Sequence, residues 1–296
     1  MKPVVFAFPD NEDIAQDLVA HLGAELGEMN VHRFPDGETV TRILTPVAGR
    51  KVILVCTLDR PDEKFLPLIF AAATLRDLGA LEVGLIAPYL CYLRQDERFR
   101  DGEGITARYF AKALGQWIDW ILTVDPHLHR INSLSDIYRV PSAVVHAAPA
   151  ISGWIRENVS NPLVIGPDNE SKQWVAAVAD KAGAPYLVLE KTRFGDREVA
   201  ISMPENISGS NYTPVLVDDI ISTGKTMIKT VENLVTQGTP PPICIGIHAI
   251  FAETAYQDFQ ITGVTKLITT NSIQHPSNVI DLSTLIANSV KHLLKS

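Results

Sequence analysis

The sequence is poor in the features that mark secreted, membrane and nucleic-acid-binding proteins. It has three cysteines, an odd number without a C-x-x-C pair, which fits a reducing compartment better than a disulfide framework. No apolar run reaches the roughly 18 residues of a membrane span, and the first residues are too briefly apolar for a signal peptide. The net charge of −8 lacks the cationic excess that binds a phosphate backbone. We therefore expect a cytoplasmic protein without a membrane or nucleic-acid partner.

The sequence also lacks a complete nucleotide P-loop, although Gly224, Lys225 and Thr226 match the end of one. The P-loop pattern needs a glycine five positions before its last one, and that position holds Asp219. The P-loop interpretation therefore fails. Because the chain is acidic, we expect a divalent metal to neutralise any phosphate that it handles.

The segment around these residues reads as a strand, a loop and a helix. An apolar run leads into Asp218 and Asp219, and a hydroxyl-rich turn then precedes apolar residues at helical spacing. The hydroxyls of Ser222, Thr223 and Thr226 would face the positive end of the helix dipole, which favours a phosphate. The paired carboxylates suit the vicinal hydroxyls of a sugar. The alternative is that the two acids merely cap the helix.

Short apolar runs alternate with amphipathic segments along the whole chain, which predicts parallel sheets covered by helices on both faces. We expect an α/β protein whose two halves have one architecture. The predicted domains are 1–145 and 146–281, with 282–296 a candidate to return to the first. The predicted strands are 4–8, 51–56, 83–87, 120–124, 163–166, 186–189, 214–217, 243–251 and 267–269. The predicted helices are 11–26, 63–78, 105–117, 148–157, 170–181, 228–235 and 282–294.

Ligands bind at the carboxyl ends of parallel strands, so we examined the polar segments that follow the apolar runs. The first is RFPDGET (Arg33–Thr39), which reads either as an ordinary turn or as a base-binding segment. In the second interpretation Phe34 stacks on a base while Asp36 and Glu38 accept hydrogen bonds from its amino group or the ribose.

A second polar segment follows the predicted strand 83–87. It contains Arg94, Gln95 and Asp96 in succession, which reads either as a solvated loop or as a polyphosphate contact. Guanidinium groups bind phosphate oxygens through a bidentate fork, which favours the second interpretation.

Two further segments offer metal ligands. His127 and His129 form an H-x-H pair, but no nearby cysteine or third histidine completes a zinc site. His127 would instead contact a magnesium nucleotide directly or through water. Asp168 either caps the helix that follows it or, if it lies on a strand end next to that of His127, shares a metal with it.

The segment LEKTRFGDREV (Leu189–Val199) places Lys191 and Arg193 on alternate positions of an extended stretch, with Gly195 and Asp196 at a flexible tip. An exposed hairpin explains this pattern. So does phosphoryl transfer, because paired cations on a mobile loop stabilise charge that develops on the transferring oxygens.

The order of these blocks carries a family resemblance. The DDIISTGKT segment resembles the phosphoribosyl-diphosphate loop of type I phosphoribosyltransferases. Together the blocks RFPDGE, RQD, DPH, GPD, KTR…EV and DDIISTGKT resemble the ribose-phosphate diphosphokinase (phosphoribosyl-diphosphate synthetase) family over nearly the whole chain. Ser222 and the short KTRFGDREV segment resemble the archaeal-type members.

The resemblance implies two phosphoribosyltransferase-like domains, each with a mainly parallel sheet. It implies magnesium-dependent transfer of the β,γ-diphosphoryl group of ATP to the 1-hydroxyl of ribose 5-phosphate, and a homo-oligomer whose ATP site is shared between subunits. The implied site residues are Lys191 and Arg193 for catalysis; Phe34, Asp36, Gly37, Glu38, Arg94, Gln95 and Asp96 for ATP; His127 and Asp168 for Mg²⁺; and Asp218, Asp219, Ser222, Thr223, Gly224, Lys225 and Thr226 for ribose 5-phosphate.

Two alternatives stay open. A purine or pyrimidine phosphoribosyltransferase would share the DDIISTGKT loop but does not need the RFPDGE and RQD blocks. A catalytically silent or altered-substrate relative would be expected to lose Lys191 and Arg193, and both are present. No general base is assigned from the sequence.

Overall fold

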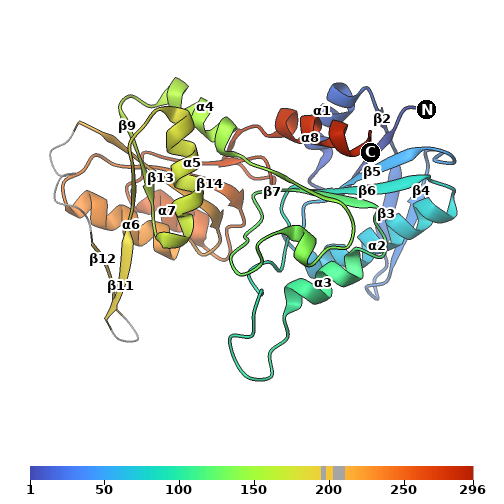
Figure 1. The fold of residues 1–296 in the computed structure, drawn as a ribbon, viewed down its shortest axis with the longest axis horizontal. Coiled ribbons are helices and arrows are strands. Elements are labelled where there is room, and N and C mark those ends of the chain that lie inside the picture. Colours follow the sequence, from blue (N-terminus) through green and yellow to red (C-terminus); the bar gives the residue numbers. More distant parts are fainter. Residues whose placement is uncertain (195–197, 203–210, 296) are drawn as a thin grey trace. The chain divides into compact units, whose positions relative to one another are not determined.

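The computed structural model describes residues 1–194, 198–202 and 211–295, with the backbone alone described for Glu190–Phe194 and Glu198–Ser202 (Figure 1). The chain divides into two compact units. Unit 1 comprises Met1–Val145 and Ser283–Ser296, and unit 2 comprises His146–Leu282. No helix in the described ranges is both long and apolar enough to cross a membrane.

Unit 1 is built on a six-stranded parallel sheet with strand order β2-β1-β5-β6-β7-β8. The β-branched and aliphatic runs of its central strands are buried on both sides, as parallel sheets require. Helices α1 and α8 cover one face, and α2 and α3 cover the other (Figure 1). The elements are β1 (Val4–Ala7), α1 (Glu12–Leu22), β2 (Glu25–Leu26), β5 (Lys51–Val55), α2 (Pro61–Asp77), β6 (Glu82–Ala87), α3 (Thr106–Leu114), β7 (Trp120–Val124), a 3-10 turn (Leu134–Asp136), β8 (Ser142–Val145) and α8 (Ser283–Leu293).

A separate antiparallel hairpin joins β2 to β5. It consists of β3 (Met29–Arg33) and β4 (Thr39–Ile43), and its side chains alternate between half-buried and exposed. Met29, Val31 and Ile43 pack on the core of unit 1. The hairpin therefore lies with one face on the unit, and its turn, Phe34–Glu38, stands at the far end.

Helix α8 belongs to unit 1 although unit 2 precedes it in the chain. Its buried residues Ile286, Ala287 and Val290 face the sheet. At its start the Ser283 hydroxyl donates a hydrogen bond to Asp17 Oδ2 over 2.8 Å. The helix thus completes the layer that α1 begins.

Unit 2 repeats the plan of unit 1. Its six parallel strands have the order β10-β9-β13-β14-β15-β16, and a hairpin, β11 with β12, again joins the second strand along the chain to the third. Helices α4 and α5 cover one face, and α6 and α7 the other (Figure 1). The elements are α4 (Ala148–Asn158), β9 (Pro162–Gly166), a 3-10 turn (Asn169–Ser171), α5 (Lys172–Ala182), β10 (Tyr186–Val188), β11 (Glu190–Phe194), β12 (Glu198–Ser202), β13 (Thr213–Ile221), α6 (Lys225–Thr236), β14 (Ile243–Ala249), α7 (Ala255–Ile261), β15 (Lys266–Thr270) and β16 (Asn278–Ile280).

The predicted fold class is confirmed, and so is the expectation that the two halves have one architecture. Several predicted boundaries differ from the observed ones, two of them by four residues. The first helix ends at Leu22 rather than Leu26, because Gly23 adopts a left-handed conformation with φ 62° and the chain enters β2. Strand β13 runs to Ile221 instead of ending at Val217.

Candidate active site

The two neighbouring acids of unit 2 lie inside β13, not in the loop that the sequence predicted. Ile220 and Ile221 still pair with β14, so the strand continues past both carboxylates. Asp218 accepts a hydrogen bond from the Asp219 amide over 3.1 Å, and Asp219 accepts one from the Ile220 amide over 2.8 Å. The Asp219 side chain is buried and that of Asp218 is half-buried. Asp218 is therefore the carboxylate better exposed to a ligand.

The turn after β13 ends at a glycine that no other residue replaces easily. Gly224 is the N-cap of α6 and has φ 67°, a region that L side chains rarely adopt. A Cβ at this position would lie 2.5 Å from Phe259 Cε2 of α7. The glycine thus combines a left-handed turn with close packing of α7 against it.

Polar side chains surround this turn at the start of α6. Thr223 and Lys225 are exposed, and Ser222 and Thr226 are half-buried. The Ser222 carbonyl accepts a hydrogen bond from the Ala252 amide over 3.1 Å, which ties the turn to the segment after β14. Backbone amides, hydroxyls and a cation at a helix N-terminus form an arrangement that binds phosphate. The predicted residues 222–226 are thus brought together at the carboxyl end of β13.

The predicted base-binding segment of unit 1 forms the turn of the β3–β4 hairpin. The Gly37 amide donates to the Phe34 carbonyl over 2.9 Å, and the Phe34 amide donates to the Glu38 carbonyl over 2.7 Å. Gly37 has φ 93° whereas Asp36 is not in the left-handed region, which defines a type I turn followed by a glycine bulge. Asp36 Oδ1 also accepts from the Glu38 amide over 3.2 Å. In this turn Phe34 is 43% exposed.

The three residues of the RQD block lie in the loop after β6 and differ in how buried they are. Arg94 and Gln95 are exposed, whereas the Asp96 side chain is 3% exposed. Asp96 accepts hydrogen bonds from the backbone amide and the Nη1 of Arg130, over 3.1 and 3.2 Å. Asp96 thus holds two loops together, and the ATP contact that the sequence predicted for it stays a prediction.

Arg130 itself was missed by the sequence reasoning. Its Nη2 lies 2.9 Å from a carboxylate oxygen of Glu97, and its guanidinium carbon lies 5.5 Å from the centre of the Phe99 ring. The arginine therefore anchors the whole loop that presents Arg94 and Gln95. The sequence carried a faint signal, since Arg130 closes the DPHLHR block.

The predicted metal ligands follow strands of two different sheets. His127 follows β7, and its ring centre lies 4.3 Å from that of His129 in an edge-to-face contact. Asp168 follows β9, and its Oδ1 accepts from the amides of Glu170 and Ser171 over 3.1 and 3.3 Å. The condition for a shared metal, that His127 and Asp168 follow adjacent strands of one sheet, is not met, because β7 and β9 belong to separate sheets. The helix-cap interpretation of Asp168 is confirmed.

Lys191 and Arg193 lie in β11, paired with Ile201 and Val199 of β12. Alternate positions of a strand share a face, so the backbone fits the expected spacing. Their side chains lie outside the described residues, as do Gly195 and Asp196.

All three cysteines lie in the hydrophobic cores of the two units. Cys56, Cys91 and Cys244 are buried and unpaired. Burial raises the pKa of the Cys56 thiol to about 12 and raises the pKa of the other two thiols as well. Buried neutral thiols are inert, which excludes thiolate catalysis at these positions.

Comparison with known proteins assigns the family. Residues 3–117 match the model of the N-terminal domain of ribose phosphate pyrophosphokinase, and residues 133–285 match the phosphoribosyl transferase domain. The chain is 32% identical to a ribose-phosphate pyrophosphokinase of Methanopyrus kandleri, over 98% of this chain and 99% of that one. It is 34% identical to a ribose-phosphate pyrophosphokinase of Saccharolobus solfataricus, over 87% and 89% of the two chains.

The chain belongs to the ribose-phosphate pyrophosphokinase family. Both relatives are archaeal, in agreement with the resemblance read from the sequence. The crystal structure of phosphoribosylpyrophosphate synthetase from Mycobacterium smegmatis matches the fold with a TM-score of 0.87, at 23% identity, over 100% of this chain and 99% of that chain. The two-sheet architecture is thus that of a solved member.

A buried polar network lies at the carboxyl ends of strands β14 and β15 in unit 2, and the sequence did not predict it. His248 of β14 is 1% exposed, and its Nδ1 lies 2.9 Å from Ser272 Oγ. The hydroxyls of Ser272 and Thr270 both donate to the Ile247 carbonyl, over 2.9 and 2.7 Å. The hydroxyl-rich run TTNS (Thr269–Ser272) was the available signal. Because β14 adjoins β13, the network stiffens the strand ends beside Asp218.

Proposed function

We propose that the protein transfers the β,γ-diphosphoryl group of Mg–ATP to the 1-hydroxyl of ribose 5-phosphate, giving phosphoribosyl diphosphate and AMP. The observation that carries the proposal is the arrangement of polar residues at the carboxyl end of β13 and the start of α6 in unit 2. There Asp218 and Asp219 lie near the carboxyl end of β13, and the turn 222–224 leads from the end of that strand directly into α6. Family membership supports the same reaction.

The acceptor would bind at that edge. The amides and hydroxyls of the turn and the Lys225 ammonium would hold the 5-phosphate, aided by the α6 dipole. Asp218, half-buried, would accept hydrogen bonds from the ribose hydroxyls. Asp219 is buried and engaged with the Ile220 amide, so its contribution is to fix the strand end and the local negative charge.

The donor would bind to unit 1 residues. Phe34 would stack on adenine, while Asp36, Gly37 and Glu38 supply the shape and acceptors of the turn. Arg94 and Gln95 are exposed on an anchored loop and suit the phosphates. We assign Asp96 the positioning of this loop through Arg130 rather than a direct ATP contact.

Magnesium is the metal that the donor set fits best. Carboxylate oxygen is a ligand that Mg²⁺ prefers, and the ion keeps several waters. Asp168 would offer a carboxylate to an ion at unit 2, and His127 would contact a magnesium nucleotide at unit 1 directly or through water. The ion would neutralise the phosphates of ATP in a chain of net charge −8.

In this reaction the 1-hydroxyl oxygen attacks the β-phosphorus in line, the bond from that phosphorus to the α,β-bridging oxygen breaks, and AMP leaves. Catalysis would depend on positioning and on charge stabilisation by Lys191 and Arg193. We assign no general base.

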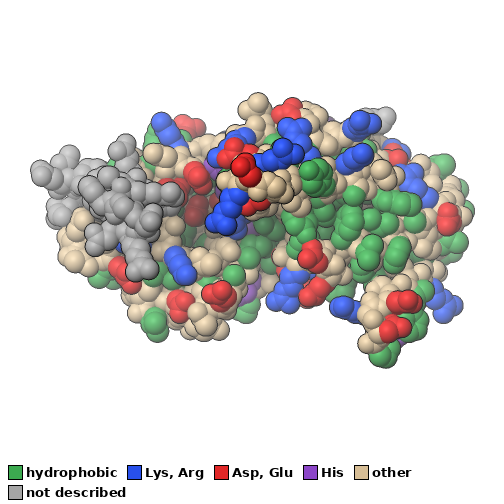
Figure 2. Space-filling view, turned by 90° about the horizontal axis from the view of Figure 1, so that it is seen from below, with side chains coloured by type: hydrophobic (Ala, Val, Ile, Leu, Met, Phe, Trp, Pro, Cys, Tyr) green, Lys and Arg blue, Asp and Glu red, His purple; other side chains and the backbone are tan. Residues whose placement is uncertain are grey.

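We also propose a homo-oligomer in which Phe34 reaches the ATP site of a neighbouring subunit. Phe34 lies in the turn at the end of a hairpin and is 43% exposed. Figure 2 shows hydrophobic side chains gathered on unit 1. Val40 of β4 and Leu66 and Phe70 of α2, which are neighbouring elements, are 46%, 55% and 42% exposed. An apolar surface of this kind commonly marks an interface.

Phosphorus NMR tests the reaction. With Mg–ATP and ribose 5-phosphate we expect AMP and a new sugar-linked diphosphate signal. Formation of ADP would mean γ-phosphoryl transfer and would refute the mechanism. Unchanged ATP would favour a silent or altered-substrate relative.

A further inference from the structure

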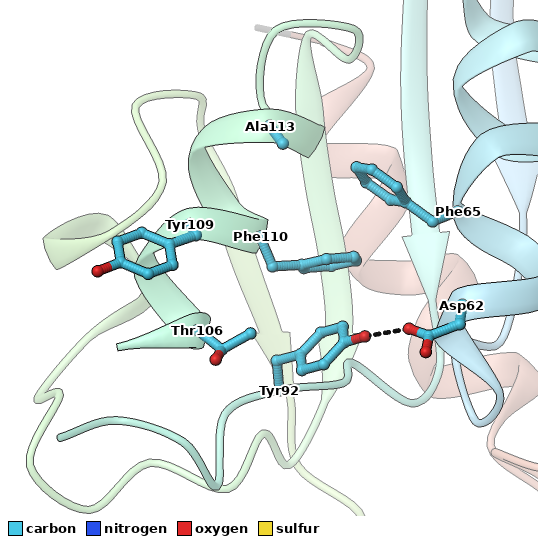
Figure 3. Close-up of a pocket in the computed structure, with 7 residues that line it drawn as sticks. All are labelled: Asp62, Phe65, Tyr92, Thr106, Tyr109, Phe110 and Ala113. Carbon is cyan, nitrogen blue, oxygen red and sulfur yellow. Dashed lines mark hydrogen bonds between the residues drawn. The ribbon is translucent and has the colours of Figure 1, made fainter. Parts of the chain in front are cut away.

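Unit 1 contains a pocket of about 400 Å³ that none of the predicted site residues lines. Its walls come from α2, α3 and the loop after β6 (Figure 3): Asp62, Phe65, Tyr92, Thr106, Tyr109, Phe110 and Ala113. The residues from α3 recur at three- and four-residue spacing, so they share one helix face. The volume is in the range of ordinary small-molecule sites, which is roughly 300–1,000 Å³.

The pocket has aromatic walls and one acidic corner. The ring centres of Phe65 and Tyr92 each lie 5.0 Å from that of Phe110. The Tyr92 hydroxyl donates a hydrogen bond to the Asp62 carboxylate, and Tyr109 lies on the side away from that pair (Figure 3). Among the described residues of the lining, Asp62 is the one charged group, and no lysine or arginine is present.

This lining selects a chemical class of ligand. Aromatic walls favour a flat ring, and a carboxylate accepts hydrogen bonds from an amino group. A carboxylate has about four acceptor sites, so Asp62 can accept from a ligand as well as from Tyr92. A phosphate would meet a negative charge without a cation to balance it. The lining therefore fits an unphosphorylated aminated heterocycle.

The pocket is directly connected to the loop that presents Arg94 and Gln95. Tyr92 has φ 61°, a strained conformation for a bulky residue and one that clusters at ligand sites. Its carbonyl accepts from the Gln95 amide over 2.9 Å, and the Gln95 carbonyl accepts from the Ala107 amide at the start of α3 over 3.3 Å. Two walls of the pocket thus hold Gln95 from both sides.

We propose that this pocket binds an aminopurine or aminopyrimidine, free or as a nucleoside, and that its occupancy changes the ATP affinity of the Arg94–Gln95 loop. The second part rests on the proposed function, and the first does not. A ligand that contacts Tyr92 and Thr106 would stabilise one conformation of the turn from 92 to 95. The site differs from the substrate site in taking a ligand without phosphate.

Calorimetric titration of the full chain with adenosine tests the binding, with purine riboside, which lacks the amino group, as the matched ligand. We expect adenosine to bind about tenfold more tightly, since a charge-assisted hydrogen bond is worth about the 1.4 kcal/mol that a tenfold change represents. Asp62→Ala should abolish that preference, and Tyr92→Phe, which removes only the bond to Asp62, should keep it.

Tyr109→Ala should weaken both ligands by about tenfold through lost stacking. Tyr186→Ala, which removes an exposed tyrosine from unit 2, should change neither. Phe34→Ala, at the proposed ATP site, should also leave adenosine binding unchanged. Loss of binding in Phe34→Ala but not in Tyr109→Ala would put adenosine in the substrate site and overturn the proposal. So would an absence of binding together with a Tyr109→Ala shift in molecular mass by light scattering, which would make the pocket part of a subunit interface.

The coupling is tested by the ATP affinity of the same protein, measured by equilibrium dialysis with and without saturating adenosine. We expect a severalfold change that Tyr109→Ala removes. Adenosine binding without any change in ATP affinity would overturn the coupling alone. If no phosphoribosyl diphosphate forms in the NMR assay while adenosine still binds, the proposed function fails and the pocket does not.

Discussion

The two units have the same strand order, yet their corresponding segments carry different residues. In each unit a hairpin joins the second strand along the chain to the third. The hairpin of unit 1 ends in the turn with Phe34, whereas that of unit 2 carries Lys191 and Arg193. Corresponding hairpins of a repeated fold thus contain an exposed phenylalanine in one copy and two cationic residues of the sequence in the other.

The third strand differs in the same way. β5 has five residues and ends before Cys56, and α2 then begins with Arg60 as N-cap and Pro61 as its first residue. β13 has nine residues, includes both acids, and leads through a short turn to Gly224. Of the two described turns at this position, only the one in unit 2 has a glycine as the N-cap of the following helix. Duplication of a fold therefore does not duplicate its site.

The largest expected effect separates the two hairpins by function. Lys191→Ala should lower kcat by about 10²–10³-fold, the range for loss of one group that stabilises developing charge, with ATP affinity nearly unchanged. Steady-state kinetics and equilibrium dialysis measure the two quantities. Lys181→Ala, an exposed lysine on α5, is the control. Equal losses in kcat and ATP affinity would contradict the assignment.

Gly224→Ala tests the turn that distinguishes the third strands. The positive φ and the 2.5 Å approach to Phe259 should together lower the free energy of unfolding by about 2 kcal/mol and weaken ribose 5-phosphate binding. Gly238→Ala, at φ 79° with nothing within 4 Å, should cost about half as much and leave binding unchanged. Urea denaturation and substrate titration measure both effects. Equal destabilisation by the two variants would mean that the contact with Phe259 is unimportant.

Phe34→Ala should weaken ATP binding by about tenfold, in the range of one lost base–aromatic stack. The effect should appear only in the oligomer, because the ring would serve a neighbouring site. Val279→Ala in unit 2 is the control, since Val279 is also an exposed apolar residue and lies outside the proposed interface. Light scattering and ATP titration across protein concentrations provide the measurement. Full activity of a strictly monomeric form would refute the shared site.

The smallest expected effect is on the pH dependence of stability, through a histidine of unit 2. Burial lowers the pKa of His275, whose ring packs on Phe251 and Tyr256. A histidine with a lowered folded pKa contributes stability above its unfolded pKa of about 6.5, and that contribution declines as the pH falls. His275→Gln should therefore flatten the decline in Tm between pH 7 and pH 5. An unchanged acid slope would contradict the prediction.

Much of the fold follows from the sequence because both sheets are parallel. The buried runs ILV in β5 and WILTV in β7 are too short for helices and too apolar for exposed strands, so their type is unambiguous. The hairpin β3–β4 was not predicted as strands. Its residues alternate between half-buried and exposed, but in β4 Thr39 and Thr41 take half-buried positions and Val40 an exposed one, which hides the pattern in the sequence.

The candidate site was predictable in composition but not in geometry. The sequence identified the acids and the turn of unit 2, yet it ended β13 too early because Asp218 interrupts the apolar run. It could not show that Asp96 points at Arg130, since the two residues are 34 positions apart. Contacts between distant residues depend on the packing of whole elements, which no local pattern encodes.

The return of α8 to unit 1 affects how the chain is made. Ile286 and Val290 fill the layer beside α1, yet the ribosome must first synthesise all of His146–Leu282. At about 5–20 residues per second, that takes roughly 7–30 s. During this interval the sheet of unit 1 has an uncovered apolar strip, and the synthesis of unit 2 is complete before α8 emerges. Although the strands of unit 1 emerge first, unit 1 is the last to be completed, because α8 is synthesised after unit 2. Unit 1 is therefore the part of the nascent chain that most needs a chaperone.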